Sequence, residues 1–340
     1  MILIDATYIN ELGGKNLLEY FLKSIDEKGL TPIFFVLLDK RISLESSNLE
    51  NYFYIEASEA NRSKFYKMNS NKFSKTFCFA NVPPPINLKI DTFIYFHNDL
   101  LIDIYKTDFS FKRKIVFLLK RFYIKLRNRK NYKWLVQTDL IKEKLSQKMA
   151  INKSRILTLP FYFENFTELK KEKPPNSFLY VSGYLPHKNH LRLVKAFVLA
   201  ANKFNKSIYL NLTLKDDDFN TLMESFSEAF PSNLIINNLG VLNLEGINVA
   251  YEDNENLIFP SLKESFGLPL IEATLKQLYV ICSDLEYTHY VIKPSLIFNP
   301  LEIEDISNSI YKTLTLNKLN KPKLITKNKI DQIINMLTSV

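Results

Sequence analysis

The sequence predicts an α/β protein with two doubly wound domains, each a parallel sheet between helices. Short β-rich runs alternate with helical patterns along the chain, and several of these runs are continuously apolar. Continuously apolar strands are typical of parallel sheets that are covered on both faces. The alternation stops once and then restarts, and a length of 340 residues also fits two domains.

The first domain is expected over residues 1–160. Its candidate strands are 2–6, 33–38, 53–56, 76–79, 93–96, 134–137 and 155–159. Amphipathic helical patterns fall at 15–27, 112–129 and 139–148. The segment 164–176 is polar and charged and ends in Pro-Pro, which is typical of a linker or a surface crossing.

The second domain is expected over residues 161–340, with the last helix free to pack back on the first domain. Its candidate strands are 178–182, 208–213, 234–237, 257–259, 279–281 and 296–298. Helices are expected at 189–202, at 218–230, from Leu268 onward and near 303–314, followed by a basic tail. Ligands of such sheets bind beyond the carboxyl ends of the strands, so we expect the site in a cleft between the domains.

Composition excludes several classes of protein. Hydrophobic residues make up 46% and charged residues 24%, which excludes a disordered chain, and no apolar run approaches the ~18 residues of a membrane span. The first ten residues, MILIDATYIN, lack a basic n-region, so we expect no secretory signal. Cys78 and Cys282 lie far apart in the sequence, which predicts neither a disulfide framework nor a thiolate metal site and indicates a reducing, cytoplasmic setting.

Basic charge is concentrated in one predicted helix. Ten basic residues and no acidic ones lie between Lys112 and Lys133, so a net charge of +9 leaves −1 for the rest of the chain. Helical periodicity places 115, 118, 119, 122 and 126 on a core-facing stripe, with Phe117 and Ile124 on the opposite, basic side. Apolar side chains among cations favour an anionic membrane surface over a solvated helix or a nucleic-acid patch. The residues expected to contact lipid are Arg113, Lys114, Phe117, Lys120, Arg121, Ile124 and Arg127.

The chain contains only seven glycines, about 2% against a usual ~7%, so each is expected where a side chain does not fit. Four of them lie in three strand-to-helix loops. Gly13 and Gly14 follow the first predicted strand, Gly183 follows the strand at 178–182, and Gly267 precedes the helix at Leu268.

Residues 258–273, IFPSLKESFGLPLIEA, combine a strand end, a glycine loop and a helix start. The backbone N–H groups of Phe266, Gly267 and Leu268 would point out of the helix end and form an anion site, which Gly267 lets a phosphate approach. Glu272 lies about one turn into the helix and is able to accept two hydrogen bonds from the vicinal hydroxyls of a ribose. Glu264 precedes the helix on the other side of the phosphates. Both glutamates are also common as helix-capping residues, and that alternative stays open.

Residues 180–197, YVSGYLPHKNHLRLVKAF, form a second loop of this kind. Gly183 follows a strand, and Lys188 precedes a helix where its ammonium group would meet a diphosphate. The alternative is a β-turn with a solvated lysine.

These two segments resemble the donor-domain motifs of family 4 retaining glycosyltransferases, which have the GT-B fold of two facing Rossmann-like domains. The first half is similar to the bacterial surface-polysaccharide members in IDATYINELGGK, CFANVPPP, YFHNDLL and WLVQT. The resemblance is scattered over the chain up to about residue 310. The motif at 258–273 is specific, whereas the motifs of the first half are looser.

The resemblance implies a role for each candidate residue. Glu264 faces the transferred sugar, Lys188 neutralises the diphosphate, and His97 lies near the sugar as a third catalytic group. Glu272 binds the donor ribose, while Ser265, Phe266, Gly267 and Leu268 line the diphosphate. Gly13 and Gly14 line the cleft between donor and acceptor. Tyr184 follows Gly183 where many relatives have an arginine, so the neutralising charge is expected from Lys188 or Arg192.

The resemblance also implies chemistry without a metal ion or other cofactor. Asp216, Asp217 and Asp218 are therefore expected to form a solvated turn or helix cap rather than a metal site.

The function expected is metal-independent, retaining transfer of a hexose from a UDP- or GDP-linked sugar. The acceptor expected is a lipid-linked or saccharide glycan during O-antigen or capsule synthesis, and the location expected is the cytoplasmic face of the cell membrane. No nucleic acid partner is expected. Two alternatives stay open: a sugar-nucleotide epimerase with the same fold, and a non-catalytic subunit at the membrane.

Overall fold

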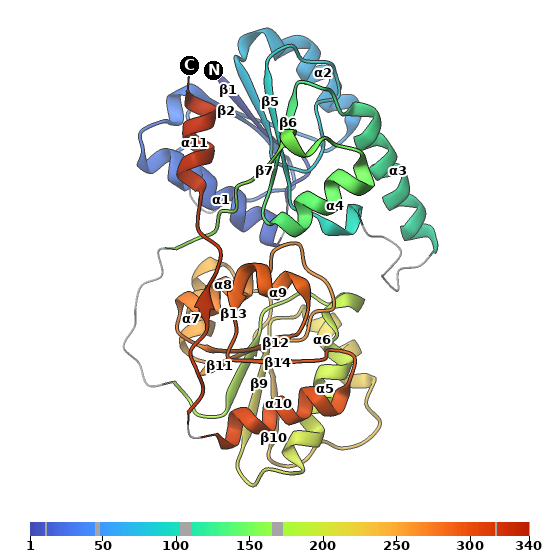
Figure 1. Ribbon diagram of the computed structural model, residues 1–340, viewed down its shortest axis with the longest axis vertical. Helices are drawn as coiled ribbons and strands as arrows, with labels where there is room; N and C mark the ends of the chain where they lie inside the picture. Colours follow the sequence, from blue (N-terminus) through green and yellow to red (C-terminus); the bar gives the residue numbers. More distant parts are fainter. Residues whose placement is uncertain (11, 45–47, 103–110, 165–172, 317, 340) are drawn as a thin grey trace. The chain divides into compact units, whose positions relative to one another are not determined.

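The computed structural model contains two units, each built around its own parallel sheet (Figure 1). It describes residues 1–10, 12–44, 48–102, 111–164, 173–316 and 318–339, with only the backbone of Leu12 and Arg113. The first unit comprises Met1–Phe163 and Lys327–Val340, and the second comprises Glu164–Thr326. The predicted α/β class with two doubly wound domains is confirmed.

The first unit has a seven-stranded parallel sheet in the order β3-β2-β1-β4-β5-β6-β7. All five residues of β1 are buried, because helices cover both faces of the sheet (Figure 1). The strands are β1 (Ile2–Ala6), β2 (Phe34–Asp39), β3 (Tyr52–Ile55), β4 (Lys75–Cys78), β5 (Asp91–Phe96), β6 (Tyr132–Val136) and β7 (Ile156–Thr158). The helices are α1 (Leu12–Glu27), α2 (Glu59–Asn69), α3 (Phe111–Arg127), α4 (Asp139–Met149) and α11 (Ile330–Thr338).

The second unit has a six-stranded parallel sheet in the order β10-β9-β8-β11-β12-β14. These strands are β8 (Ser177–Tyr180), β9 (Ile208–Leu212), β10 (Leu234–Asn238), β11 (Asn256–Phe259), β12 (Tyr279–Ser283) and β14 (Leu296–Phe298). A separate antiparallel pair joins β13 (Ile292–Lys293) to β15 (Lys323–Leu324). The helices are α5 (His190–Ala201), α6 (Asp216–Glu224), α7 (Leu244–Glu252), α8 (Leu268–Leu275), α9 (Glu286–Val291) and α10 (Ile303–Thr315).

Each sheet reverses its winding direction once. β1 lies between β2 and β4, and β8 lies between β9 and β11, so the chain leaves these neighbouring strands in opposite directions. Ligands of doubly wound sheets bind at the carboxyl ends of the strands at such a switch point. The predicted glycine loops follow β1, β8 and β11, and all three therefore lie at the switch point of their own sheet.

Four of the described helices, α2, α7, α9 and α11, were not predicted from the sequence. α2 is rich in polar residues, α7 contains Gly246, and α9 has only six residues, so none of these three segments shows a clear helical pattern. The helix expected near 303–314 is α10, which packs on α5 inside the second unit. The basic tail instead ends in α11, which contacts α1 of the first unit. Most of the expected linker, 165–172, lies outside the described residues.

Helix α3 turns part of the face that we predicted to be on the membrane toward the core. Ile124 is 1% exposed and belongs to a core cluster with Trp134, and Phe117 packs against the same cluster. Arg121 also faces inward, where its guanidinium donates to the carbonyls of Ile102 (3.4 Å) and Lys148 (2.7 Å). The assignment of Ile124 and Phe117 to the lipid contact was wrong, whereas Arg121 is half-buried.

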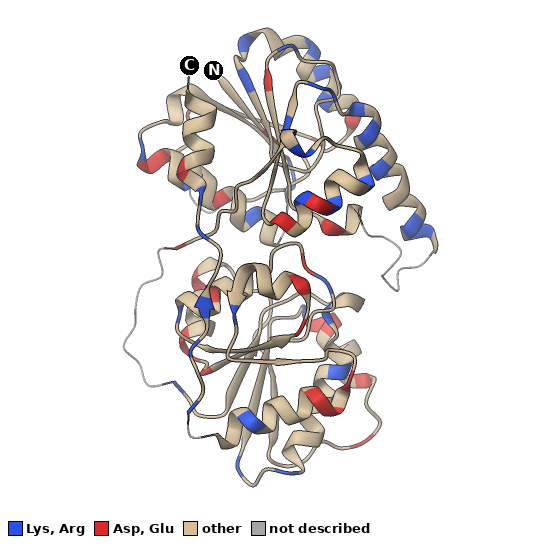
Figure 2. Ribbon diagram, in the orientation of Figure 1, with Lys and Arg blue, Asp and Glu red and all other residues tan. Residues whose placement is uncertain are grey.

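The apolar stripe that we expected in the core is exposed instead. Leu119 is 63% exposed and Phe122 is 66% exposed. The other exposed apolar residues of α3 are Phe111, Ile115, Val116, Leu118 and Leu126. The exposed cations are Lys112, Lys120 and Lys125, and Figure 2 shows basic residues along the whole helix. We call this set the outer face of α3.

Candidate functional site

The loop after β11 forms the start of helix α8 as the sequence predicts. Gly267 is the N-cap residue with φ +81°, in the left-handed region that favours glycine. A Cβ at this position would lie 3.1 Å from Cδ1 of the buried Leu270, so both the backbone and the packing require glycine. Pro269 lies in the first turn, where its missing N–H is tolerated. The helix therefore presents its partial positive charge at this loop.

Glu264 and Lys188, which lie far apart in the sequence, form an ion pair. Lys188 Nζ lies 2.6 Å from Glu264 Oε1, and the two side chains are 16% and 13% exposed. The ammonium group also lies 5.8 Å from the centre of the Phe259 ring. Glu264 was predicted to face the sugar of the donor molecule and Lys188 to neutralise its diphosphate. The two side chains are in contact, with little solvent around them.

Buried hydrogen bonds bring their two loops together. The hydroxyl of Tyr180 donates to the carbonyl of Lys188 (2.7 Å) and lies 3.0 Å from Ser261 Oγ. The N–H of Leu262 donates to the carbonyl of His187 (2.7 Å). The loop after β8 and the loop after β11 are thus joined side by side, as their neighbouring strands require.

Asn189 fixes the end of the Lys188 loop. It adopts a left-handed backbone with φ +64°, and its side-chain amide donates to the carbonyls of Pro260 (3.2 Å) and Pro300 (2.8 Å). Its Oδ1 accepts from Arg192 Nη1 at 3.0 Å. Arg192, which we proposed as a replacement for the missing family arginine, therefore lies directly beside this loop.

Gly183 and Tyr184 begin the same loop. Among the described residues, no heavy atom lies within 4 Å of a Cβ built on Gly183. The surrounding chain does not require a glycine there, whereas a ligand approaching the backbone would. The ring of Tyr184 lies 5.4 Å from that of His190, at the first position of α5.

Glu272 lies in α8 and has a partner that the sequence did not reveal. The hydroxyl of the fully buried Tyr251, from α7, donates to Glu272 Oε2 at 2.7 Å. Burial raises the pKa of Glu272 above its ordinary value, and the hydrogen bond from Tyr251 partly opposes this. The hydrogen bond from Tyr251 fixes the orientation of the Glu272 carboxylate. The remaining lone pairs of the carboxylate oxygens can accept from a further donor.

The predicted residues of the first unit lie around His97. A Cβ built on Gly14, in the first turn of α1, would lie 3.8 Å from His97 Nε2, while Gly13 is exposed in the same turn. Asn81 Oδ1 accepts from the backbone N–H of His97 (2.7 Å), and its Nδ2 lies 3.4 Å from Nε2. The amide therefore donates to Nε2, which leaves the proton on Nδ1, where no described residue offers a partner. Burial lowers the pKa of His97 to about 4, so the ring is neutral at neutral pH.

The remaining predicted residues lie at the starts of helices α8 and α6. Phe266 is buried at 2% exposure beside the half-buried Ser265 and Leu268. Asp216, Asp217 and Asp218 form the first turn of α6, where negative charge is favourable. In the described part of the chain, no group of three histidine, cysteine or acidic residues is placed to hold a metal ion.

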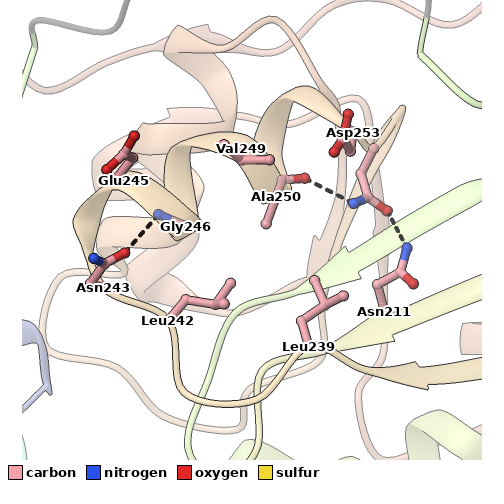
Figure 3. A pocket seen from close by; sticks show the side chains of 10 residues that line it. Asn211, Leu239, Leu242, Asn243, Glu245, Gly246, Val249, Ala250 and Asp253 are labelled. Atoms are coloured by element: carbon pink, nitrogen blue, oxygen red, sulfur yellow. Dashed lines mark hydrogen bonds between the residues drawn. The ribbon is translucent and has the colours of Figure 1, made fainter.

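A pocket of about 540 Å³ lies beside α7, the helix that carries Tyr251 (Figure 3). A row of buried amides forms one wall: Asn211 Nδ2 donates to Asn254 Oδ1 at 2.7 Å, and Asn254 Nδ2 donates to the carbonyl of Ala250 at 2.8 Å. Leu239, Leu242 and Val249 give the pocket apolar surface. The sequence analysis did not find this pocket, whose lining comes from residues 239–254 together with Asn211 of β9.

The fold and these loops define a class of protein: a two-unit α/β protein with helix starts and acidic side chains at the switch points of its sheets. The family model described as glycosyl transferases group 1 matches residues 162–331, half of the chain, and the chain belongs to this family. The resemblance to family 4 glycosyltransferases of GT-B fold is thereby confirmed.

Individual relatives agree with this family. The O-antigen chain mannosyltransferase RfbU of Salmonella typhimurium is 23% identical over 192 residues, which is 56% of this chain. The match covers 52% of RfbU, so the chain spans about half the length of this curated relative. The fold is similar to WaaG, a glycosyltransferase involved in lipopolysaccharide biosynthesis (TM-score 0.68, 14% identity, all of both chains covered). It is also similar to Anabaena HepE in complex with UDP-glucose (TM-score 0.68, 11% identity, 92% of this chain and 89% of HepE covered).

Proposed function

We propose that this chain is a retaining, metal-independent glycosyltransferase that moves a hexose from a nucleoside-diphosphate sugar to a lipid-linked or saccharide acceptor. The observation on which this rests is the ion pair between Lys188 and Glu264 at the start of α8. This ion pair places a cation and an acid beside the start of a helix, in two neighbouring loops. That is the arrangement needed to hold a diphosphate beside a sugar ring.

In the reaction, the bond between the anomeric carbon and the diphosphate breaks while the acceptor oxygen bonds to the same face of that carbon. The leaving diphosphate takes up negative charge, which the α8 N–H groups and Lys188 stabilise, and accepts the proton of the acceptor hydroxyl. Glu264 faces the sugar and favours positive charge on its ring in the transition state. Glu272 accepts hydrogen bonds from the ribose, and His97 positions a sugar hydroxyl.

The class of donor is supported by the relatives. HepE binds UDP-glucose, and RfbU is named a mannosyltransferase of O-antigen chains. We therefore propose a UDP- or GDP-linked hexose as donor and a growing surface polysaccharide as acceptor.

We also propose that the outer face of α3 rests on an anionic bilayer at the inner side of the cell membrane. Large exposed apolar residues such as Phe122 lie between exposed lysines, and this pattern is typical of an interfacial helix. Each lysine near an anionic surface contributes about 1 kcal/mol of binding free energy. In the described part of the chain, no helix is long and apolar enough to cross a bilayer.

The donor proposal is tested by thermal unfolding with UDP, GDP, ADP, CMP and dTDP. A nucleotide at 100 times its Kd stabilises the folded chain by about 2.7 kcal/mol, so UDP or GDP should raise the unfolding temperature well above the others. The exposed Asp217→Asn variant is the control and should respond like the parent. If neither UDP nor GDP shifts the transition, the proposed donor is wrong.

A further inference from the structure

Glu59, at the first position of α2, joins α3 to the loop that follows β1. Its Oε1 accepts from the hydroxyl of Tyr8 at 2.5 Å, and its Oε2 accepts from the hydroxyl of Tyr123, on α3. Burial and the neighbouring Glu59 raise the pKa of Tyr123 to about 12, so its hydroxyl remains a donor at neutral pH. Three elements are therefore joined by one carboxylate.

Arg62, one turn further along α2, extends these contacts into the interior. It is 1% exposed, and its Nε donates to Asp5 Oδ2 at 2.7 Å. Its Nη1 donates to the carbonyl of Pro83 (2.8 Å) and its Nη2 to the carbonyl of Val82 (3.0 Å). A buried guanidinium with these partners holds the loop after β4 in one place, since each bond lost would leave a buried donor unpaired.

The same Nη1 lies 3.4 Å from Glu59 Oε1, so the two residues form one network. The loop that Arg62 holds includes Asn81, whose side chain binds both the backbone and the ring of His97. Asn81 has a left-handed backbone with φ +68°, a conformation that few residues adopt without support from neighbouring contacts. Hydrogen bonds therefore run without a break from Tyr123 on α3, through Glu59 and Arg62, to the loop that sets the position of His97.

We propose that Glu59 and Arg62 are positioning residues, which fix the loop at Asn81 and with it His97 relative to the helix that meets the membrane. The inference rests on the proposed membrane contact of α3 and adds to it a physical link to the acceptor side of the site. An anionic bilayer that restrains α3 would thereby also restrain residues 79–85, although none of them belongs to the outer face of α3.

The test is hydrogen exchange measured by mass spectrometry on the full chain. It is done with and without vesicles of phosphatidylcholine containing about one third phosphatidylglycerol. In the parent chain, vesicles should slow amide exchange in α3 and also in residues 79–82; Pro83, Pro84 and Pro85 have no amide proton to exchange. In Tyr123→Phe, α3 should still be protected, while residues 79–82 should exchange at least about tenfold faster and no longer respond to vesicles; tenfold is the lower bound for one lost hydrogen bond to a charged group.

Tyr54→Phe is the matched control, because it removes a tyrosine hydroxyl from the same unit at a residue 37% exposed on the edge strand β3. It should behave like the parent chain. An unchanged melting temperature in Tyr123→Phe separates positioning from a general loss of stability.

Two results would overturn the inference in different ways. Equal exchange of residues 79–82 in the parent and in Tyr123→Phe would show that Glu59 does not transmit the position of α3. An absence of protection on α3 itself in the parent would remove both the membrane contact and this link.

Discussion

Lys188 Nζ lies 2.6 Å from Glu264 Oε1 in a loop pair where both side chains are mostly buried. Each group therefore partly neutralises the other, and a diphosphate that binds at α8 competes with Glu264 for the ammonium group. The two residues have opposite charges at one site, and their substitutions should consequently have opposite effects on diphosphate binding.

Glu264→Gln should keep or increase affinity for a nucleoside diphosphate, because Lys188 is released from its partner. The same variant should slow sugar transfer at least about a hundredfold, since the negative charge facing the sugar is lost. Lys188→Met should weaken diphosphate binding and also destabilise the second unit by leaving a mostly buried carboxylate unpaired. Calorimetric titration and donor-consumption rates measure the two effects; parent-like transfer by Glu264→Gln would contradict the assigned role.

Two glycine substitutions should separate folding from binding. Gly267→Ala should lower the unfolding free energy by about 1–2 kcal/mol, because its backbone has φ +81° and the new methyl group meets Leu270. Gly183→Ala should leave thermal unfolding unchanged, because the described residues leave open space there, yet it should weaken nucleotide binding by blocking the approach to the backbone. Equal nucleotide affinity in Gly183→Ala and the parent would mean that no ligand approaches this loop.

Nucleotide affinity should depend on the protonation of Glu272. Only the ionised carboxylate accepts both ribose hydrogen bonds, and burial raises its pKa, so affinity should fall on acidification at a higher pH than for an ordinary glutamate. Tyr251→Phe removes a hydrogen bond that lowers this pKa, and the fall should move to still higher pH. Tyr209→Phe, at an exposed position on β9, is the control. Titrations from acidic to neutral pH with superimposable curves for Tyr251→Phe and the parent would disprove the link.

The raised pKa of Glu272 also predicts the sign of its effect on stability. Its contribution to the unfolding free energy is fully present below the ordinary pKa of glutamate and is lost as the pH rises through the raised pKa. Glu272→Gln should remove this dependence, which is measurable by chemical denaturation of the unliganded chain at several pH values.

Substitutions on α3 should distinguish its two faces. Leu119→Asp with Phe122→Asp should abolish sedimentation with anionic vesicles while thermal unfolding stays as in the parent, because both side chains are exposed. Ile124→Asp should instead unfold the first unit, since it buries a charge among core residues such as Trp134. If the double variant sediments with vesicles like the parent, the outer face of α3 is not the membrane contact.

The candidate site was predictable where its signal is local in the chain. Gly267 and the two glutamates at 264 and 272 fall within nine residues, so their relation to a helix start follows from the sequence alone. For Lys188 and Glu264, only binding to the same ligand was predictable. Their direct contact was not, because it depends on β8 and β11 being neighbours in the sheet. No pattern in the sequence indicated a role for Tyr251. Its helix α7 has a weak amphipathic pattern, and its hydroxyl bonds to Glu272 on another helix, α8.

By itself, the sequence determined the strands of the two parallel sheets, most of the helices, the presence of two domains and the glycine loops, because each depends on residues within a few positions of one another. The tertiary structure decided which side of α3 is buried, that α11 returns to the first unit, and that Arg62 holds the loop at Asn81. The apolar pattern of a helix shows that one of its faces is apolar. Whether that face packs on the protein core or contacts something outside it depends on the elements packed around the helix, which can lie anywhere in the chain.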